Sequence, residues 1–485
     1  MSENPSVVIV GSGFAGLGMA IQLIKAGFHD FVILEKDKEL GGTWRDNTYP
    51  GCACDVPSHM YSYSFELNPR WSRLFAPQQE IWDYMRDVAA KYGLEKYLRY
   101  DSRVDALEYD DQARRWDVIV ADGRRYRPRA VIYGIGALHV PSYPDLPGLP
   151  KFQGKTFHSA EWDHDYDLTG KRVAVIGTGA SAIQFVPQVA KKASQLYVFQ
   201  RTAPWIQPKP DVAIPKSAQW LFEHVPGTAR VFRDALFWIL EGRALGFALD
   251  PRLMAPLEHS ARSHLKRQIP DPELRRKLTP NYRIGCKRIL LSNDYYPTFN
   301  LPHVELVTEG IGEVTENAIV TGDGRELEVD CIIYGTGFKV VETLASQHIV
   351  GRNGLKIQEA WADGAEAYHG VTIPGFPNFF MLMGPNTGLG HHSMIFMMEA
   401  QFQHILGCLR LIQRQGGDTI EVTRRALRRY NDRMHRRLRK GVWNEGGCQS
   451  WYLDENGVNR TLWPGFAFEY WAGTRRVKAS DYVVS

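Results

Sequence analysis

The sequence predicts an α/β fold, because one pattern occurs twice in the chain, about 165 residues apart. In each copy an apolar strand runs into a glycine-rich turn, and the turn opens a helix that leads to a second strand. Strands that alternate with helices form parallel sheets covered by helices. A long stretch with helical spacing follows the second copy. We therefore expect two Rossmann-like dinucleotide-binding domains, with a helical insertion in the second.

The first copy lies close to the start of the sequence. Its strand, helix and second strand are expected at residues 6–10, 17–26 and 31–34. Its fingerprint glycines are Gly11, Gly13 and Gly16. Glycine permits the tight turn and lets a pyrophosphate approach the helix N-terminus, where free N–H groups bind an anion. Glu35, nineteen residues after the last glycine, is placed to accept hydrogen bonds from ribose hydroxyls, so this copy predicts FAD binding.

The second copy differs at the residue that meets the ribose. Its strands are expected at residues 172–176 and 196–199, with a helix starting near residue 182. Its candidate turn residues are Gly177, Thr178, Gly179 and Ser181. The third fingerprint position holds Ala182, which that position tolerates. Arg201, nineteen residues later, favours a ribose 2′-phosphate, so this copy predicts NADPH binding.

The two copies divide the chain into five expected segments. A Pro-rich linker near residues 141–150 separates them, and a strand at residues 331–334 leads the chain back to the first domain. The segments are a first FAD part at 1–149, a first NADP part at 150–208, a helical insertion at 209–283, a second NADP part at 284–339 and a second FAD part at 340–485. The insertion has a wide apolar stripe, which we interpret as packing on the domains; a substrate-tunnel wall or a membrane contact are the alternatives.

Composition excludes several classes of protein. Hydrophobic content of 44% and charged content of 23% are ordinary for a soluble globular protein, and a net charge of +4 gives no argument for nucleic-acid binding. No apolar run reaches transmembrane length, and the early first strand leaves no room for a signal peptide. The six cysteines lack zinc or redox spacing, which suits a reducing cytosol. We expect a cytoplasmic monomer or weak homodimer without a metal site.

Two longer motifs carry a family resemblance. Residues 152–163 read FQGKTFHSAEWD, which matches the pattern FxGxxxHxxxW(P/D). Residues 41–55 match [A/G]GxWxxxx[F/Y]P[G/M]xxxD, with Trp44 and Asp55 at its fixed positions. Through these motifs the chain resembles the type I Baeyer–Villiger monooxygenases, which are class B flavoprotein monooxygenases, over nearly its whole length. It is similar to the phenylacetone and hydroxyacetophenone monooxygenases of that family.

The resemblance implies a reaction. Members of the family reduce FAD with NADPH, and the reduced flavin reacts with O2 to a C4a-peroxyflavin. One oxygen atom is then inserted next to a ketone carbonyl, which gives an ester or lactone. The substrate is a small-molecule ketone, and the 12% aromatic content hints at bulky or aryl ketones.

The resemblance also assigns roles to residues. Arg288, in the pair Lys287–Arg288, would keep the peroxide anionic, and Asp55 would hold the guanidinium by paired hydrogen bonds. Residues expected to line the flavin are Thr43 and Trp44. Residues expected at NADPH are Thr178, Arg201 and Lys287, with Gln184 as a weaker candidate and Trp451 in a mobile segment over the nicotinamide. His158 is expected to couple domain motion rather than transfer a proton.

Three other functions remain open at this stage. Flavin-containing monooxygenases that oxygenate sulfur or nitrogen share the layout of two fingerprints. A flavin disulfide reductase would require a closely spaced cysteine pair, and the sequence has no CxxC. A nucleotide-binding redox sensor without turnover is the non-enzymatic alternative.

Overall fold

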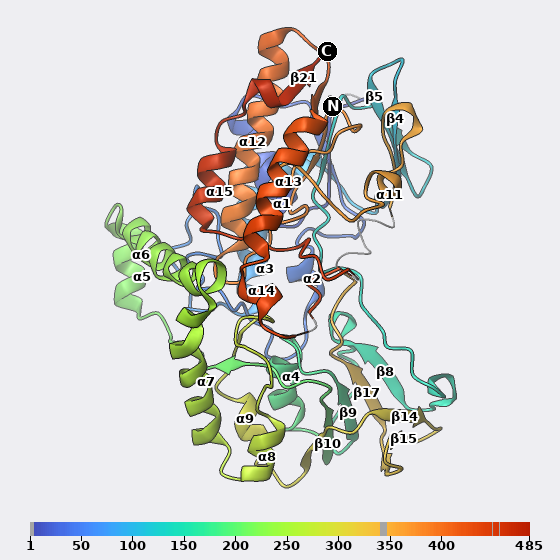
Figure 1. The fold of residues 1–485 in the computed structure, drawn as a ribbon, viewed down its shortest axis with the longest axis vertical. Helices are drawn as coiled ribbons and strands as arrows, with labels where there is room; N and C mark the ends of the chain where they lie inside the picture. Colours follow the sequence, from blue (N-terminus) through green and yellow to red (C-terminus); the bar gives the residue numbers. More distant parts are fainter. Residues whose placement is uncertain (1–3, 340–346, 449, 455) are drawn as a thin grey trace.

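The computed structural model describes residues 4–339, 347–448, 450–454 and 456–485. Two parallel five-stranded sheets lie one above the other along the long axis of the molecule, and both chain ends lie at the top of the upper half (Figure 1). This arrangement agrees with the predicted α/β class. The expected domain limits stay a prediction, and the limit at residues 339 and 340 lies where the described residues stop.

The upper sheet contains the first glycine turn. Its strands, in spatial order, are β19 (Phe379–Met381), β7 (Ala130–Tyr133), β1 (Val7–Val10), β2 (Phe31–Leu34) and β3 (Leu98–Arg99). Apart from Arg99, every residue of these strands is buried, which explains their unbroken apolar runs. Val10 pairs with Leu34 on one side and with Tyr133 on the other, so the turn after β1 opens between two strands.

The lower sheet contains the second turn. Its strands, in spatial order, are β13 (Val304–Val307), β10 (Gln195–Phe199), β9 (Arg172–Ile176), β17 (Cys331–Tyr334) and β8 (Lys155–His158). Ile176 pairs with Phe199 and with Tyr334, which repeats the arrangement around β1. The strands predicted at 172–176 and 196–199 are therefore confirmed.

Helices cover both sheets. The main ones are α1 (Phe14–Lys25), α3 (Gln78–Lys91), α4 (Ala182–Val189), α9 (Tyr295–Thr298), α12 (Met394–Gln415), α13 (Arg424–Leu438) and α15 (Ala467–Thr474). A Cβ added to Gly18 of α1 would lie 2.6 Å from the Phe402 ring of α12, so the absence of a side chain lets these two helices pack closely. The helix predicted at residues 17–26 begins three residues earlier, directly at the turn.

Smaller elements complete the chain. Minor sheets contain β4 (Val104–Asp110), β5 (Arg115–Val120), β6 (Arg125–Tyr126) and β18 (His348–Val350); β14 (Ile311–Val314), β15 (Ala318–Thr321) and β16 (Glu326–Glu328); β11 (Ile206–Gln207) and β12 (Leu290–Leu291); and β20 (Ile420–Val422) and β21 (Tyr482–Val484). Short helices are α2 (Thr43–Asp46), α11 (Ile357–Ala360) and α14 (Val442–Glu445), with single turns η1 (Leu94–Tyr97), η2 (Leu149–Lys151), η3 (Ser159–Glu161), η6 (Arg352–Gly354) and η7 (Ala479–Asp481).

Helices also fill the range predicted as an insertion. They are α5 (Lys216–His224), α6 (Thr228–Gly242), η4 (Leu245–Leu249), η5 (Pro251–Met254), α7 (Ala255–Gln268) and α8 (Pro272–Lys277). The pair α5–α6 projects from the side of the molecule (Figure 1). None of the helices in the described ranges is both long enough and apolar enough to cross a membrane.

Candidate active site

The first glycine turn leaves space for a ligand at the N-terminus of α1. A Cβ on Gly16 would lie 1.9 Å from the carbonyl oxygen of Gly11, so the turn closes on itself there. Gly11 has a φ of +95°, a backbone conformation that residues with a side chain rarely adopt. Around Gly13, by contrast, no atom lies within 4 Å of an added Cβ. The turn is therefore closely packed at Gly11 and Gly16 and open at Gly13. The open side leaves the space that a bound pyrophosphate requires.

Glu35 lies where the sequence places it, directly after β2. Its carboxylate is buried and accepts hydrogen bonds from the backbone N–H and the hydroxyl of Ser12, at 2.9 and 2.5 Å. Arg45 lies 3.4 Å from its second oxygen. Glu35 therefore fixes the conformation of the turn itself, and its role at an adenosine ribose stays a prediction.

The second turn repeats the geometry of the first. Gly177 has a φ of +110°, and a Cβ there would lie 2.3 Å from the carbonyl oxygen of Gly335. Gly179 has open space in the Cβ direction, and α4 begins three residues later, after Ser181. The Thr178 hydroxyl donates to the carbonyl of Thr202 at 3.3 Å, which ties the turn to the end of β10.

Two cations lie near this second turn. Burial lowers the pKa of Lys287, and the nearby positive charge of Arg201 lowers it further. Neither side chain forms an ion pair with an acid in the part of the chain that the structure describes. Because like charges repel, such a pair is suited to an anion that neutralises both. The 2′-phosphate predicted for this copy fits that chemistry.

Arg288 and Asp55 form a bidentate ion pair, although 233 residues separate them in sequence. The Arg288 guanidinium donates to the carboxylate through Nε at 2.9 Å and through Nη2 at 2.7 and 2.6 Å. The carboxylate of Asp55 raises the pKa of Arg288 further above its ordinary value. The Arg288 side chain keeps 38% exposure, so it remains accessible to a ligand while its charge is permanent.

Tyr61 lies close to this ion pair and contacts Trp44. The Trp44 indole N–H donates to the hydroxyl of Tyr61 at 3.1 Å, and the two rings lie 5.4 Å apart, edge to face. Burial raises the pKa of Tyr61, and Arg288 is close enough to oppose that shift. The loop at Gly42 lies against Gly13, since a Cβ on Gly42 would be 3.4 Å from the Gly13 Cα. The tryptophan motif thus connects the first turn to the ion pair.

Gln184, the weaker candidate for a cofactor contact, forms side-chain hydrogen bonds with the loop that precedes Asp55. Its side-chain oxygen accepts from the Tyr49 hydroxyl at 3.0 Å and from the Ala53 N–H at 3.3 Å. Its amide N–H donates to the Ala53 carbonyl at 2.9 Å. Gln184 on α4 therefore holds the loop that precedes Asp55, and so links the two halves of the molecule.

The C-terminal segment presents Tyr452 rather than Trp451 to the site. Trp451 is 49% exposed, whereas Tyr452 is 2% exposed and its ring packs against that of Trp451 at 4.5 Å. Burial raises the pKa of Tyr452 to about 12, and the neighbouring Arg288 opposes the rise. Sequence reasoning missed Tyr452, because adjacent aromatic residues in a loop show no periodicity that indicates which one is buried.

A disulfide lies beside the ion pair and was not expected from sequence. Cys286 and Cys448 are bonded across a separation of 162 residues. Spacing rules recognise close cysteine pairs, so a pair brought together only by tertiary folding escapes them. The bond fixes the segment before Tyr452 to the loop that contains Arg288. The other four cysteines are free and buried.

His158 lies at the end of β8, between the two halves. It is fully buried, its Nδ1 accepts from the Ala160 N–H at 3.1 Å, and burial lowers its pKa. Its ring contacts Tyr143 and Phe338, which lie on the two connections between the sheets. This position agrees with a structural role at the connections.

The chain is similar to known proteins over nearly its whole length. The pyridine nucleotide-disulphide oxidoreductase family profile matches residues 8–225. A Baeyer–Villiger monooxygenase of Pseudomonas aeruginosa is 50% identical over 99% of this chain and 92% of its own length. Another from Streptomyces coelicolor is 46% identical over 99% of this chain and 93% of its length. The chain belongs to the Baeyer–Villiger monooxygenase family.

Solved structures of the family have the same fold. An oxidized steroid monooxygenase bound to NADP superposes with a TM-score of 0.88 at 30% identity, over 100% of this chain and 99% of that one. A closed cyclohexanone monooxygenase gives 0.88 at 27% identity, with both chains fully covered. The predicted family, α/β fold class and enzyme class are thereby confirmed.

Substitution by alanine should have different effects at Gly13, which is open, and at Gly16, which is closely packed. We expect Gly13→Ala to leave the apoprotein folded and to weaken FAD binding about tenfold or more, because the Cβ occupies the open space in front of α1. Gly16→Ala should lower the melting temperature of the apoprotein, since its methyl overlaps the Gly11 carbonyl. Flavin titration and thermal denaturation of both variants test this. A Gly16→Ala apoprotein that melts like the wild type would contradict it.

The disulfide should stabilise the chain only under oxidising conditions. Cys448→Ser removes a cross-link over 162 residues, which typically costs about 2–5 kcal/mol of unfolding free energy. We expect a lower melting temperature than the wild type in non-reducing buffer. In dithiothreitol the two proteins should melt together, and this pair of measurements is the control. A difference that persists in reductant would mean that the serine acts through packing alone.

Proposed function

We propose that this chain uses NADPH, O2 and bound FAD to insert one oxygen atom next to the carbonyl of a small-molecule ketone, giving an ester or lactone. The bidentate Arg288–Asp55 pair, beside the tryptophan motif, is the observation on which this proposal rests. When bound, FAD takes electrons from NADPH and supplies the activation of O2. A related structure described as OTEMO in complex with FAD and NADP, with a TM-score of 0.88 and 28% identity, supports the choice of cofactors.

The two turns would hold the two dinucleotides. The open fronts at Gly13 and Gly179 would receive the pyrophosphates at the N-termini of α1 and α4, and Gly11, Gly16 and Gly177 keep the turns compact. Glu35 is placed for the FAD ribose. Thr43 and Trp44 would contact the flavin, because their loop packs directly on the first turn. For NADPH, the residues are Thr178, Ser181, Arg201 and Lys287.

Arg288 would supply a fixed positive charge at the reacting oxygen. An oxygen anion in a site with little water is costly unless a cation accompanies it, and arginine cannot give up its proton at working pH. The guanidinium uses Nε and Nη2 on Asp55, so its Nη1 is left to face a ligand. The same charge would stabilise the oxyanion of the tetrahedral adduct on the ketone.

Asp55 and Tyr452 would position that cation. Asp55 fixes the plane of the guanidinium, and its negative charge is balanced by Arg288 itself. Tyr452, buried beside the pair, limits the access of water. Gln184 would position the loop before Asp55, so we assign it to positioning rather than to cofactor contact. We place Trp451 at the exposed edge of the C-terminal segment that would cover the nicotinamide.

Substrate, assembly and location are the finer parts of the proposal. A bulky or aryl ketone fits a site bordered by Trp44, Tyr61 and Tyr452. We further propose a monomer or weak homodimer in the cytoplasm, where the Cys286–Cys448 pair would be kept reduced much of the time. Oxygenation of sulfur would accompany ketone oxidation as a secondary activity. Ketone-dependent NADPH consumption measured together with ester formation distinguishes these activities from a sensor without turnover.

The coenzyme preference should depend on Arg201. Arg201→Ala should raise the KM for NADPH by about ten- to a hundredfold and leave NADH use nearly unchanged, because one charge-assisted contact to a phosphate is lost. Steady-state kinetics with both coenzymes measure this, and Lys192→Ala, an exposed cation near the same sheet, is the matched control. Equal use of NADH and NADPH by the wild type would remove this role from Arg201.

Removing Arg288 should impair the oxidative part of the reaction and leave the reductive part intact. In Arg288→Ala we expect NADPH to be consumed still, ester formation to fall about a hundred- to a thousandfold, and hydrogen peroxide to accumulate instead. Parallel assays of NADPH, ester and hydrogen peroxide measure the split. Arg283→Ala, an exposed arginine on the same segment, is the control and should behave like the wild type.

A double-mutant cycle tests whether Asp55 acts through Arg288. Asp55→Ala alone should slow both parts of the reaction and keep FAD bound, and Asp55→Asn should be intermediate because it keeps hydrogen bonds. The losses in Asp55→Ala/Arg288→Ala should be strongly non-additive. Losses that add in free energy would show two independent residues and reduce Asp55 to a turn residue.

A further inference from the structure

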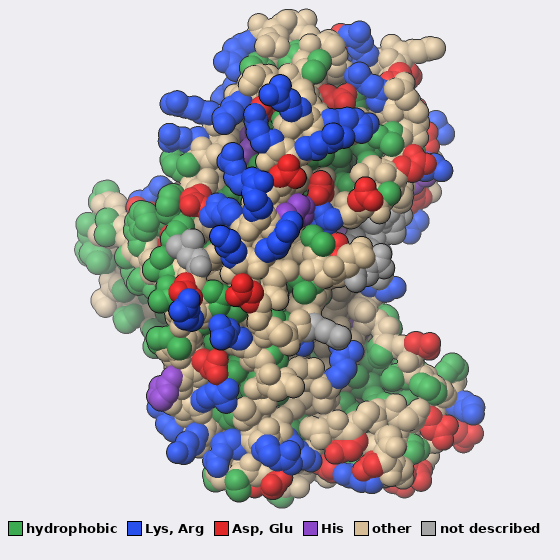
Figure 2. All heavy atoms as spheres, viewed as in Figure 1, with side chains coloured by type: hydrophobic (Ala, Val, Ile, Leu, Met, Phe, Trp, Pro, Cys, Tyr) green, Lys and Arg blue, Asp and Glu red, His purple; other side chains and the backbone are tan. Residues whose placement is uncertain are grey.

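The hairpin formed by α5 and α6 lies in the region where exposed large hydrophobic side chains are concentrated. Of the sixteen large hydrophobic side chains exposed in the described residues, nine lie between residues 212 and 253. The most exposed members on the hairpin are Val231 at 70%, Trp238 at 63%, Ile239 at 62% and Trp220 at 58%. Figure 2 shows hydrophobic side chains gathered on the projecting flank of the molecule, where Figure 1 places α5 and α6. Clusters of this kind mark interaction sites on otherwise soluble proteins.

The exposed stripe is not required to hold the hairpin in place. Phe222 and Phe232 stack at 5.3 Å between the two helices, and both rings contact the buried His59. Arg233, also buried, donates to the carbonyl of Ser62 at 3.0 Å. The inner face therefore fixes the hairpin to the upper half, and the outer face remains apolar for another reason.

The outer face of α6 reverses the usual pattern of a surface helix. Val231, Ala235, Trp238 and Ile239 recur at three- to four-residue steps and all are exposed. A surface helix ordinarily presents polar residues there. The charged residue in this stripe, Asp234, lies 3.4 Å from Arg230, and the exposed acid of α5, Glu223, pairs with Arg70. The acids are thus neutralised, and the apolar character dominates.

The apolar stripe continues on α15. Trp238 contacts Phe468 with ring centroids 6.3 Å apart. Phe468, Trp471 and Arg475 are spaced by three and four residues, so they lie on one face of the helix or its last turn, and all three are exposed. The Arg475 guanidinium lies over the Trp471 ring at 4.8 Å. The exposed side chains therefore change along this line, from the apolar stripe on α6 to the aromatic residues on α15 and then to the cationic Arg475.

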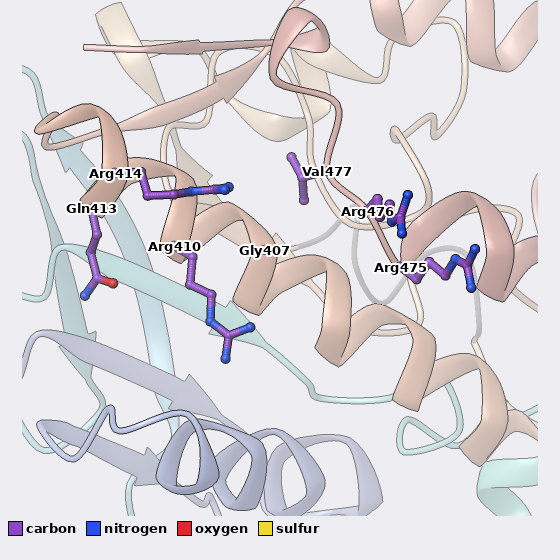
Figure 3. Close-up of a pocket in the computed structure, with 7 residues that line it drawn as sticks. All are labelled: Gly407, Arg410, Gln413, Arg414, Arg475, Arg476 and Val477. Atoms are coloured by element: carbon purple, nitrogen blue, oxygen red, sulfur yellow. The ribbon is translucent and has the colours of Figure 1, made fainter.

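That line ends in a groove of about 720 Å³ between α12 and the end of α15. Four arginines line it, and Figure 3 shows their side chains reaching from both elements: Arg410, Arg414, Arg475 and Arg476. None of the four forms an ion pair with a carboxylate in the part of the molecule that the structure covers. A concentration of cations without counter-charges attracts anionic groups such as phosphate.

We propose that the outer faces of α5, α6 and α15, together with this arginine groove, dock on an anionic phospholipid bilayer. Tryptophan and aliphatic side chains enter the headgroup–acyl boundary, and arginines beside them bind lipid phosphates. The 15 residues of α6 span about 22 Å, shorter than the hydrocarbon core of about 30 Å, so the contact is peripheral. The alternative occupant, a second copy in a two-fold contact, would bring the same arginine-rich surface of both chains together.

Vesicle flotation tests the proposal on the full-length protein with FAD bound. The wild type should float with vesicles of equal parts phosphatidylcholine and phosphatidylglycerol, less with phosphatidylcholine alone, and less at high salt. Trp238→Ser/Ile239→Ser should reduce binding about tenfold or more. Arg475→Gln/Arg476→Gln should reduce it about tenfold on the anionic vesicles and little on the neutral ones.

Matched controls keep the outcome unambiguous. Val483→Ser removes an apolar side chain that is 56% exposed on β21, and Lys191→Gln/Lys192→Gln removes two exposed cations near the lower sheet. Both controls should bind vesicles like the wild type. All variants should have the flavin content and the melting temperature of the wild type. A wild type that does not float, or a hairpin variant that floats equally well, overturns the proposal. A dimer that the hairpin substitutions convert to monomer in light scattering, without vesicle binding, overturns it in favour of a second copy.

Discussion

The ion pair between Arg288 and Asp55 is the contact on which the site depends. Asp55 ends the loop that packs on the first glycine turn, and Arg288 precedes β12 in the other half of the chain. Their bidentate hydrogen bonds therefore fix one half of the molecule relative to the other at the point where two dinucleotides would meet. A guanidinium that uses two of its three nitrogens on a carboxylate is oriented, and its third nitrogen stays available to a ligand.

Other contacts support the same junction. Gln184 holds the loop before Asp55 from α4, so the helix that would receive one pyrophosphate also positions the acid. The Cys286–Cys448 bond joins the segment before Tyr452 to the loop of Arg288, at a position two residues before that arginine. His158 fills the connection between the sheets with a ring whose pKa burial lowers, which favours its neutral form. These contacts come from distant parts of the sequence and converge within a small region.

The two faces of the helical insertion differ in their polarity and in their contacts. Its inner face is bound to the upper half by aromatic packing and a buried arginine, whereas its outer face is apolar and continues into a cationic groove. Under the proposed function, an enzyme with an apolar ketone substrate would gain from proximity to the phase in which that ketone dissolves. The proposed docking surface and the oxygenation site would then serve the same substrates, although neither requires the other.

The sequence by itself determined the repeated units and the chemistry of their ends. Strand, turn and helix follow from local patterns, so β1, β2, β9 and β10 lie within about a residue of their predicted limits. Glu35 and Arg201 follow from a fixed offset within each unit. The motifs likewise identified Asp55 and Arg288 as candidates, through family resemblance.

Only the tertiary structure decided which side chains of the loops meet. It turned Gln184 toward Ala53, buried Tyr452 in place of Trp451, and joined Cys286 to Cys448. It also decided that the apolar stripe of α6 faces outward, which periodicity cannot tell, because a stripe has the same spacing whether a domain or solvent lies against it. Loops and exposed faces depend on partners far away in the chain, and local sequence contains no record of those partners.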